Sequence, residues 1–302
     1  MVSNITIPEL PGSDTDNPGL IFKLKSAQQQ SKDHLWSHHW LSPSGEKLIS
    51  YGKQDSYHWL RFPALADFSI SANLKEIFCY PLAEIPQETI RHLLLDQVLP
   101  RCLAHQGKIM LHASGVQLEQ GLLLFIGESG AGKSTLAGNF HQVGNPAISD
   151  DCLWVKETEG EIVAIPSYGG LRLWEDSLEV LFANEQDIDS MAHYSTKKRL
   201  TLSENHTVGS SNGMPVLAVI VLPAPVQSSP TEVILDRLSH REAFIALMKQ
   251  SFHLNVMDPK RIERHVQALG RIAPRLASFR LSMPHDYELL PLVRQKIVEK
   301  VI

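Results

Sequence analysis

The chain has 302 residues, of which 43% are hydrophobic and 20% are charged, so we expect one large domain or two of ordinary size with a substantial buried core. A formal charge of −5 gives no electrostatic reason to expect nucleic-acid or membrane binding, and no apolar run is long enough to span a bilayer. The three scattered cysteines lack metal-ligand spacing, and no signal segment is recognisable; both features favour buried free thiols in a cytoplasmic protein.

The N-terminal third is predicted to be a separate module over residues 1–104. Residues 1–30 carry prolines and a run of glutamines, which indicate a loose arm or an edge strand. Residues 31–80 contain several aromatic, strand-like segments, and residues 86–103 have helical apolar spacing. We therefore expect a small α+β module. Its tryptophans and histidines either form its core and edges or present a surface that recognises a substrate.

The most informative feature is the glycine-rich loop, residues 127–134, which fits the G-x-x-x-x-G-K-[ST] pattern of a phosphate-binding loop. Glycines let successive N–H groups point at phosphate oxygens, Lys133 brings a charge to the β- and γ-phosphates, and the Ser134 hydroxyl suits Mg²⁺. The apolar run 122–126 predicts a buried strand before the loop, and residues 133–141 predict a helix whose N-terminus favours anions. We therefore expect a nucleoside triphosphate bound by Gly127, Glu128, Ser129, Gly130, Ala131, Gly132, Lys133, Ser134 and Thr135.

The rest of the chain alternates strand and helix patterns. Strands are expected after residue 109 and at 148–155, 162–166, 217–222, 233–235 and 279–283. Ser239 and Glu242 form a capping box before a helix at 243–252. Asp258-Pro259 starts a helix at 262–272, and a last helix covers about 287–302. Residues 105–302 are therefore predicted to form an α/β nucleotide-binding domain.

An acidic pair, Asp150-Asp151, follows only one helix after Lys133. The later apolar strand, 216–223, ends without a carboxylate, so this pair is the candidate acidic partner of the loop. We expect it in the strand next to the loop, beside the γ-phosphate. One carboxylate would hold Mg²⁺ directly or through water, and the other would accept a proton from the attacking hydroxyl. In isolation, two adjacent aspartates form a solvated turn or a helix cap.

Three segments together resemble the catalytic domain of HPr kinase/phosphorylase, and more closely the HPr-kinase-related P-loop kinases outside that enzyme's own sugar-regulation system. They are residues 111–116, the glycine-rich loop and residues 148–151, and residues 166–174 resemble the same relatives. The resemblance covers about residues 105–285. It implies the phosphoenolpyruvate-carboxykinase-like variant of the P-loop fold, with a mixed sheet and helices. It also implies ATP- and Mg²⁺-dependent phosphorylation of a serine on a protein or peptide, by an enzyme type that often forms homo-oligomers.

The resemblance also assigns roles. His112 falls on a histidine close to the transferred phosphate. Asp150 is assigned as the base, because successive strand residues face opposite ways, and Asp151 and Ser134 as the metal ligands; the reverse order of the aspartates stays open. The cluster Lys197-Lys198-Arg199 is either a solvated loop or neutralises phosphate charge, with Arg199 favoured. Arg172 is a further candidate unless it faces solvent. The predicted catalytic residues are Asp150, Asp151, His112, Lys133 and Arg199.

The chain departs from the family at residues 167–170, Ser-Tyr-Gly-Gly, where the resembled enzyme has a glutamate-containing segment. This departure argues against the reverse reaction, phosphorolysis of phosphoserine, more than against the kinase reaction. The family's N-terminal domain is not recognisable in residues 1–104, so HPr is only a weak expectation as substrate. Two alternatives stay open: a small-molecule kinase that phosphorylates a metabolite hydroxyl, and a non-catalytic ATP-binding regulator.

Overall fold

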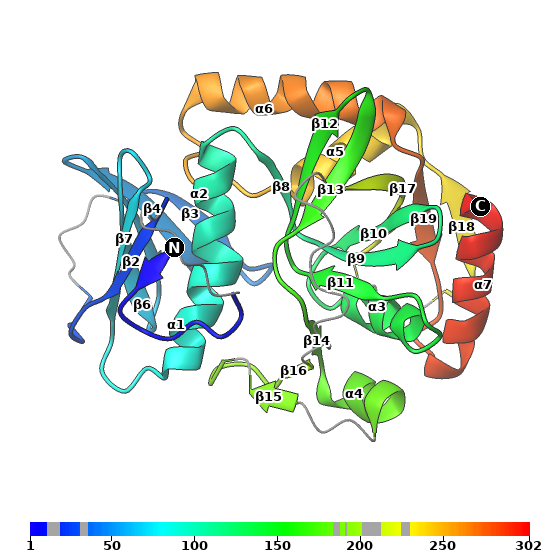
Figure 1. Cartoon of the computed structure of the whole chain (residues 1–302), viewed down its shortest axis with the longest axis horizontal. Helices are drawn as coiled ribbons and strands as arrows, with labels where there is room; N and C mark the ends of the chain where they lie inside the picture. The colour runs from blue at the N-terminus through cyan, green and yellow to red at the C-terminus, as the bar shows by residue number, and fades with distance from the viewer. Residues whose placement is uncertain (11–18, 31–35, 184–187, 191, 201–212, 225–229) are drawn as a thin grey trace. The chain divides into compact units, whose positions relative to one another are not determined.

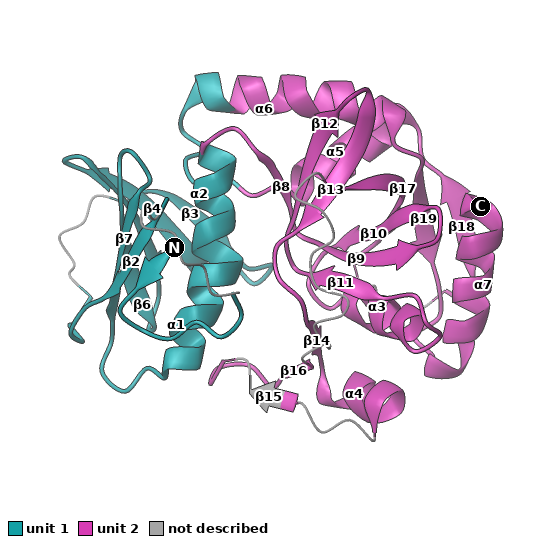
Figure 2. Ribbon diagram, viewed as in Figure 1, with its two compact units in different colours: residues 1–105, 253–261 teal, residues 106–252, 262–302 magenta. Residues whose placement is uncertain are grey.

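The computed structural model describes residues 1–10, 19–30, 36–183, 188–190, 192–200, 213–224 and 230–302. The chain forms two compact units (Figure 2): unit 1 comprises Met1–His105 and His253–Arg261, and unit 2 comprises Gln106–Phe252 and Ile262–Ile302. Residues 253–261, which the sequence analysis assigned to the second domain, lie in unit 1. Leu254 is buried in the core of that unit, and the Arg261 guanidinium donates a hydrogen bond to the His105 carbonyl.

Unit 1 contains a seven-stranded sheet in the order β1-β2-β7-β6-β5-β4-β3 (Figure 1). Its strands are β1 Val2–Ser3, β2 Ile21–Leu24, β3 Trp36–Leu41, β4 Lys47–Gln54, β5 Tyr57–Phe62, β6 Ala66–Ser71 and β7 Glu76–Pro81. The pairs between β3 and β7 are antiparallel, whereas β2 pairs in parallel with both β7 and β1. Part of the N-terminal arm therefore lies within the sheet; residues 11–18 of that arm lie outside the described residues.

The predicted helix at 86–103 is confirmed as three consecutive segments, α1 Gln87–Leu93, η1 Leu94–Val98 and α2 Leu99–His105. The middle segment is a π-helix in which the Leu99 N–H donates to the Leu94 carbonyl, five residues back. It ends at Val98, two residues before Pro100, which has no N–H to continue the regular ladder. The apolar face of this run, which includes Ile90, packs in the same core as sheet residues such as Phe68.

A buried polar cluster in unit 1 makes its stability depend on pH. The Tyr51 hydroxyl lies 2.9 Å from Nδ1 of His58, whose ring centre lies 4.7 Å from that of His105. Burial lowers the pKa of both histidines from 6.5 to about 4. The unfolded chain therefore binds more protons between these values, and the free energy of unfolding should fall as the pH drops from 6.5 to 4. Urea unfolding at a series of pH values should show this slope.

The control for this slope is the double variant His58→Gln, His105→Gln, measured over the same pH range. The remaining histidines and all carboxylates are unchanged in it, so the slope should become shallower by the contribution of these two rings. An equal slope in both proteins would contradict the assignment.

Unit 2 contains a nine-stranded mixed sheet with the main order β11-β9-β10-β17-β13-β12-β8. Strand β19 also pairs with β17, and β18 pairs with β19. The strands are β8 Ile109–Leu111, β9 Ala113–Leu118, β10 Gly121–Gly127, β11 Ala147–Asp150, β12 Leu153–Thr158, β13 Glu161–Pro166, β17 Met214–Leu222, β18 Ile234–Arg237 and β19 Ser278–Ser282. A separate three-stranded sheet has the order β14-β16-β15, with β14 Leu171–Leu173, β15 Ile188–Ser190 and β16 Lys198–Leu200.

Helices cover both faces of the central strands of unit 2. Leu123 and Phe125 of β10 lie in one core, with residues of α3 and α7; Leu122 and Leu124 lie in another, with residues of α5 and α6. Burial on both faces explains why this strand is an uninterrupted apolar run. The helices are α3 Lys133–His141, α4 Glu175–Phe182, α5 His240–Lys249, α6 Pro259–Ile272 and α7 Leu290–Val301, with short 3₁₀ segments at Ala273–Arg275 and Tyr287–Leu289. The capping box of Ser239 and Glu242 is present.

Two sequence expectations about the strands of unit 2 are wrong. The strand expected at 148–155 is two strands, β11 and β12, because Asp151 between them has a φ of +109° and cannot continue an extended ladder. The strand that carries Asp150 is also not adjacent to β10, because β9 pairs with both and lies between them. The mixed α/β class is as expected. Among the described helices, none combines the length and apolar composition needed to cross a membrane.

Candidate functional site

The glycine-rich loop joins the end of β10 to the start of α3. Gly127 runs close to β17, where a Cβ atom would lie 2.6 Å from the carbonyl oxygen of Leu222. Gly130 and Gly132 have φ values of +83° and +96°, which glycine adopts without the strain that other residues meet. The loop thus leads into the first turn of α3, where backbone N–H groups lack intrahelical acceptors and favour an anion.

Close approach at Gly127 predicts a stability effect. Gly127→Ala should lower the free energy of unfolding by on the order of 1–3 kcal/mol, because the added methyl group overlaps a backbone oxygen that cannot rotate away. Gly270→Ala is the matched control: Gly270 lies within α6, a Cβ there meets no atom within 4 Å, and the change should stabilise the protein by roughly 0.4–1 kcal/mol. Urea unfolding measures both, and a Gly127→Ala variant as stable as the parent would contradict the prediction.

Lys133 is the first residue of α3, and its side chain folds back onto the loop. Its ammonium donates to the carbonyl oxygens of Gly127, at 2.8 Å, and Glu128, at 3.0 Å. Burial lowers the pKa of Lys133 to about 8, although Asp150 opposes the shift. The predicted loop residues Glu128 and Ser129 are exposed. A positive charge is therefore held at the base of a loop whose outer part is open to solvent.

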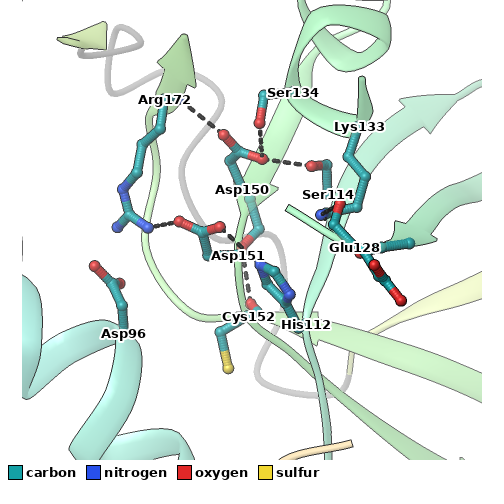
Figure 3. A network of polar contacts seen from close by, with 12 residues as sticks. Asp96, His112, Ser114, Glu128, Lys133, Ser134, Asp150, Asp151, Cys152 and Arg172 are labelled. Atoms are coloured by element: carbon teal, nitrogen blue, oxygen red, sulfur yellow. Dashed lines mark hydrogen bonds and ion pairs between the residues drawn. The ribbon is translucent and has the colours of Figure 1, made fainter. Parts of the chain in front are cut away.

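Asp150 ends β11 and receives hydrogen bonds from three directions (Figure 3). Its Oδ1 accepts from the hydroxyl of Ser134, at 3.0 Å, and from that of Ser114 on β9. Its Oδ2 accepts from the backbone N–H of Arg172 on β14, at 2.8 Å. The carboxylate is buried, so it is fixed in orientation and joined directly to the first turn of α3.

Asp151 lies in the turn after β11. The turn is held by the Asp151 N–H, which donates to the Ala113 carbonyl at 3.1 Å. One carboxylate oxygen lies 3.1 Å from Nε2 of His112, and the other forms an ion pair with the Arg172 guanidinium. The expectation that successive strand residues direct the two carboxylates apart does not apply, because the positive φ turns Asp151 out of the strand. Figure 3 shows both carboxylates beside Arg172.

His112 is not within a strand, as the sequence analysis expected, but forms the one-residue link between β8 and β9. Its N–H donates to the Gln250 carbonyl at 2.7 Å, which explains the break in the ladder. Burial, and then the charge of Lys133, lower the pKa of His112 well below its ordinary value. The ring is therefore neutral near pH 7, and its Nε2 lies within hydrogen-bond distance of the Asp151 carboxylate.

Arg199 lies on β16, where it pairs with Arg172 of β14. Its guanidinium donates to the Gly169 carbonyl at 3.2 Å and lies 5.2 Å from the ring centre of Tyr168. The same tyrosine hydroxyl accepts a hydrogen bond from Arg172, which in turn contacts Asp151. Arg172 contacts both members of the acidic pair, Asp151 through its guanidinium and Asp150 through its N–H. The Leu-Arg-Leu pattern is compatible with an Arg172 side chain that faces solvent. In the structure, however, all three residues of β14 are buried.

The remaining predicted residues are also placed. The Thr135 hydroxyl lies 3.1 Å from that of Ser177 on α4, and Ser177 lies 2.9 Å from the hydroxyl of Tyr287. The structure brings Ser134 to Asp150, whereas the sequence analysis paired Ser134 with Asp151 as metal ligands. Ser114 was not singled out as a site residue; its position in the segment 111–116, where the family resemblance begins, was the available signal.

No family model matches the chain, and no curated protein matches it. Among solved structures, those similar to it include the HPr(Ser) kinase/phosphatase from Coxiella burnetii. That structure shares 14% identity at a TM-score of 0.33, over 63% of this chain and 95% of that one. Because the identity and the TM-score are both this low, neither the fold nor the activity of that enzyme is transferred to this chain.

Proposed function

We propose that unit 2 is an ATP-dependent phosphotransferase that transfers the γ-phosphoryl group to a hydroxyl, with a serine of a protein or peptide as the acceptor. The observation that carries this proposal is the 3.0 Å contact between Ser134, in the first turn of α3, and Asp150, next to the half-buried pair of Asp151 and His112. The glycine-rich loop and two carboxylates share one small region. This arrangement supports phosphoryl transfer better than nucleotide binding alone.

In this proposal Ser134 and Asp150 hold Mg²⁺, which supplies positive charge for the β- and γ-phosphate oxygens when bound. No group of three or more His, Cys, Asp or Glu side chains within the described ranges is arranged to hold a metal ion. Phosphate oxygens and water would therefore complete the coordination, as is usual for Mg²⁺ in such sites. This assignment reverses the order favoured from the sequence. The reason is that Asp150, not Asp151, lies against the Ser134 hydroxyl.

Asp151 is then the base. Its side chain is 20% exposed, whereas Asp150 is buried, so an acceptor hydroxyl has better access to Asp151. His112 and Arg172 hold its carboxylate in place from two sides. Asp151 takes the hydroxyl proton as the acceptor oxygen bonds to the γ-phosphorus, and the bond from that phosphorus to the β-phosphate bridging oxygen breaks, leaving ADP.

The test is incubation of the protein with γ-labelled ATP, Mg²⁺ and a lysate of the organism that carries the chain. Label on a protein band, absent with Lys133→Ala, is the expected result, and mass spectrometry of the band identifies the acceptor residue. Label that passes a size filter would instead favour a metabolite kinase. Bound ATP with no transfer above the Lys133→Ala level would contradict the proposal and leave a nucleotide-binding regulator.

A further inference from the structure

Lys197 comes directly before β16, whose Arg199 pairs with Arg172, the arginine that contacts Asp151. Strand β16 pairs with β14, whose Arg172 N–H holds Asp150, so the three-stranded sheet lies against the site through that hydrogen bond. The Lys197 ammonium lies 5.1 Å from the ring centre of Trp174, the residue that precedes α4. The positive charge of Lys197 also contributes to the lowered pKa values of His112 and Lys133.

The other cations of the site already have acceptors within the protein. These are Lys133 with the carbonyls of Gly127 and Glu128, Arg172 with Asp151, and Arg199 with the carbonyl of Gly169. Within the described part of the chain, the Lys197 ammonium has no hydrogen bond and no ion pair, and its contact is the Trp174 ring. Its backbone N–H donates to the Ser195 hydroxyl at 3.2 Å, which holds the residue in place.

The Lys197 side chain is half-buried, and water can still reach its ammonium beside the Trp174 ring. The face of an aromatic ring attracts an ammonium more weakly than an anion does. The same position becomes favourable as soon as an anion enters the site, since a charge-assisted hydrogen bond then forms at low local polarity. The Lys197 ammonium is therefore positioned to bind an anion that a ligand supplies.

We infer that Lys197 binds an oxyanion that a ligand brings to the site, either the terminal phosphate of the nucleotide or a carboxylate beside the acceptor hydroxyl. This inference rests on the proposed phosphotransferase function. In either case Lys133 and Lys197 approach the acidic pair from different elements, α3 and the three-stranded sheet. Trp174, which is 42% exposed, then forms part of the wall of the same subsite.

The test compares Lys197→Ala with its neighbour Lys198→Ala, whose ammonium lies 4.0 Å from Glu175 and serves as the matched control. Calorimetry measures binding of ADP and of the non-hydrolysable ATP analogue AMP-PNP, each with Mg²⁺. If the terminal phosphate is the partner, Lys197→Ala should weaken AMP-PNP binding by roughly 10- to 100-fold, the scale of one charge-assisted hydrogen bond, and leave ADP binding within about twofold. Lys198→Ala should change neither.

If the acceptor supplies the anion, Lys197→Ala should leave both nucleotides unchanged. It should reduce labelling of the lysate protein at low lysate concentration, and a higher concentration should restore the labelling. A Lys197→Ala variant that matches Lys198→Ala in nucleotide binding and in labelling at every lysate concentration would overturn the inference. Lys133→Ala distinguishes failure of this inference from failure of the proposed function. If Lys133→Ala weakens nucleotide binding while Lys197→Ala changes nothing, the inference fails but the proposed function does not.

Discussion

Replacing Lys133 with alanine should reduce phosphoryl transfer by on the order of 10²–10⁴, the scale of losing one charge contact to the transition state. The Lys133 ammonium lies at the base of the glycine-rich loop, where it donates to two carbonyls. A bound triphosphate would offer it a stronger, charged acceptor. The measurement is the initial rate of label transfer from ATP at fixed lysate concentration. Thermal unfolding of the same sample checks that the variant is folded.

The pH dependence of nucleotide binding tests the same residue. Because burial lowers the pKa of Lys133 to about 8, the side chain is charged at pH 7 and loses its proton above pH 8. An anion stabilises the charged form, so the pKa rises in the complex and binding takes up protons between the two values. Affinity for ATP should therefore decrease from pH 8 to pH 9.5. Calorimetry in two buffers measures the proton uptake, and both effects should be absent in Lys133→Ala. An affinity independent of pH in the parent protein would contradict this role.

The two aspartates should fail in different ways when each is replaced by asparagine. Asp151→Asn removes the proposed base and keeps the shape of the side chain, so transfer should fall by on the order of 10²–10⁴ while binding of Mg·ATP changes little. Asp150→Asn weakens the proposed metal site beside Ser134, so a higher Mg²⁺ concentration should be needed for ATP binding. Titration of Mg²⁺ in the binding assay, together with the transfer rate at saturating Mg·ATP, separates the two effects.

The opposite outcome is equally clear. Asp151→Asn could instead raise the Mg²⁺ requirement, while Asp150→Asn abolishes transfer and leaves that requirement unchanged. The assignment first favoured from the sequence would then hold, with Asp150 as the base and Asp151 as the metal ligand. If neither variant changes transfer, the acidic pair is structural and the phosphotransferase proposal fails. Thermal unfolding again serves as the folding check, because Asp150 accepts three hydrogen bonds whose loss can destabilise β11.

Local features of the site followed from the residues alone. The apolar run before the loop is β10, the residues after it form α3, and the capping box of Ser239 and Glu242 starts α5. These features depend on side chains a few positions apart in the chain, so a local pattern is enough to specify them. Gly130 and Gly132 are also specified by the local pattern, because their positive φ values are a property of the loop itself.

Pairings between distant segments could not be predicted from such local patterns. Strand β9 lies between β10 and β11, and its Ser114 hydroxyl joins Asp150 from 36 residues away. The role of Arg172 depends on β14 lying next to β11, and a Leu-Arg-Leu pattern is compatible with either a buried or an exposed arginine. The contacts of Arg199 with Tyr168 and Gly169 likewise depend on how the strands pair, which the local pattern does not specify.

By itself, the sequence determined that a glycine-rich loop joins a buried strand to a helix and that two aspartates follow shortly after. The tertiary structure alone decided which aspartate lies against Ser134 and which lies beside His112. The physical reason is the backbone at Asp151: its φ of +109° ends β11 and turns the second carboxylate toward Arg172. Such a conformation is held by contacts from other strands, here the Ala113 carbonyl, and residue type does not reveal it in advance.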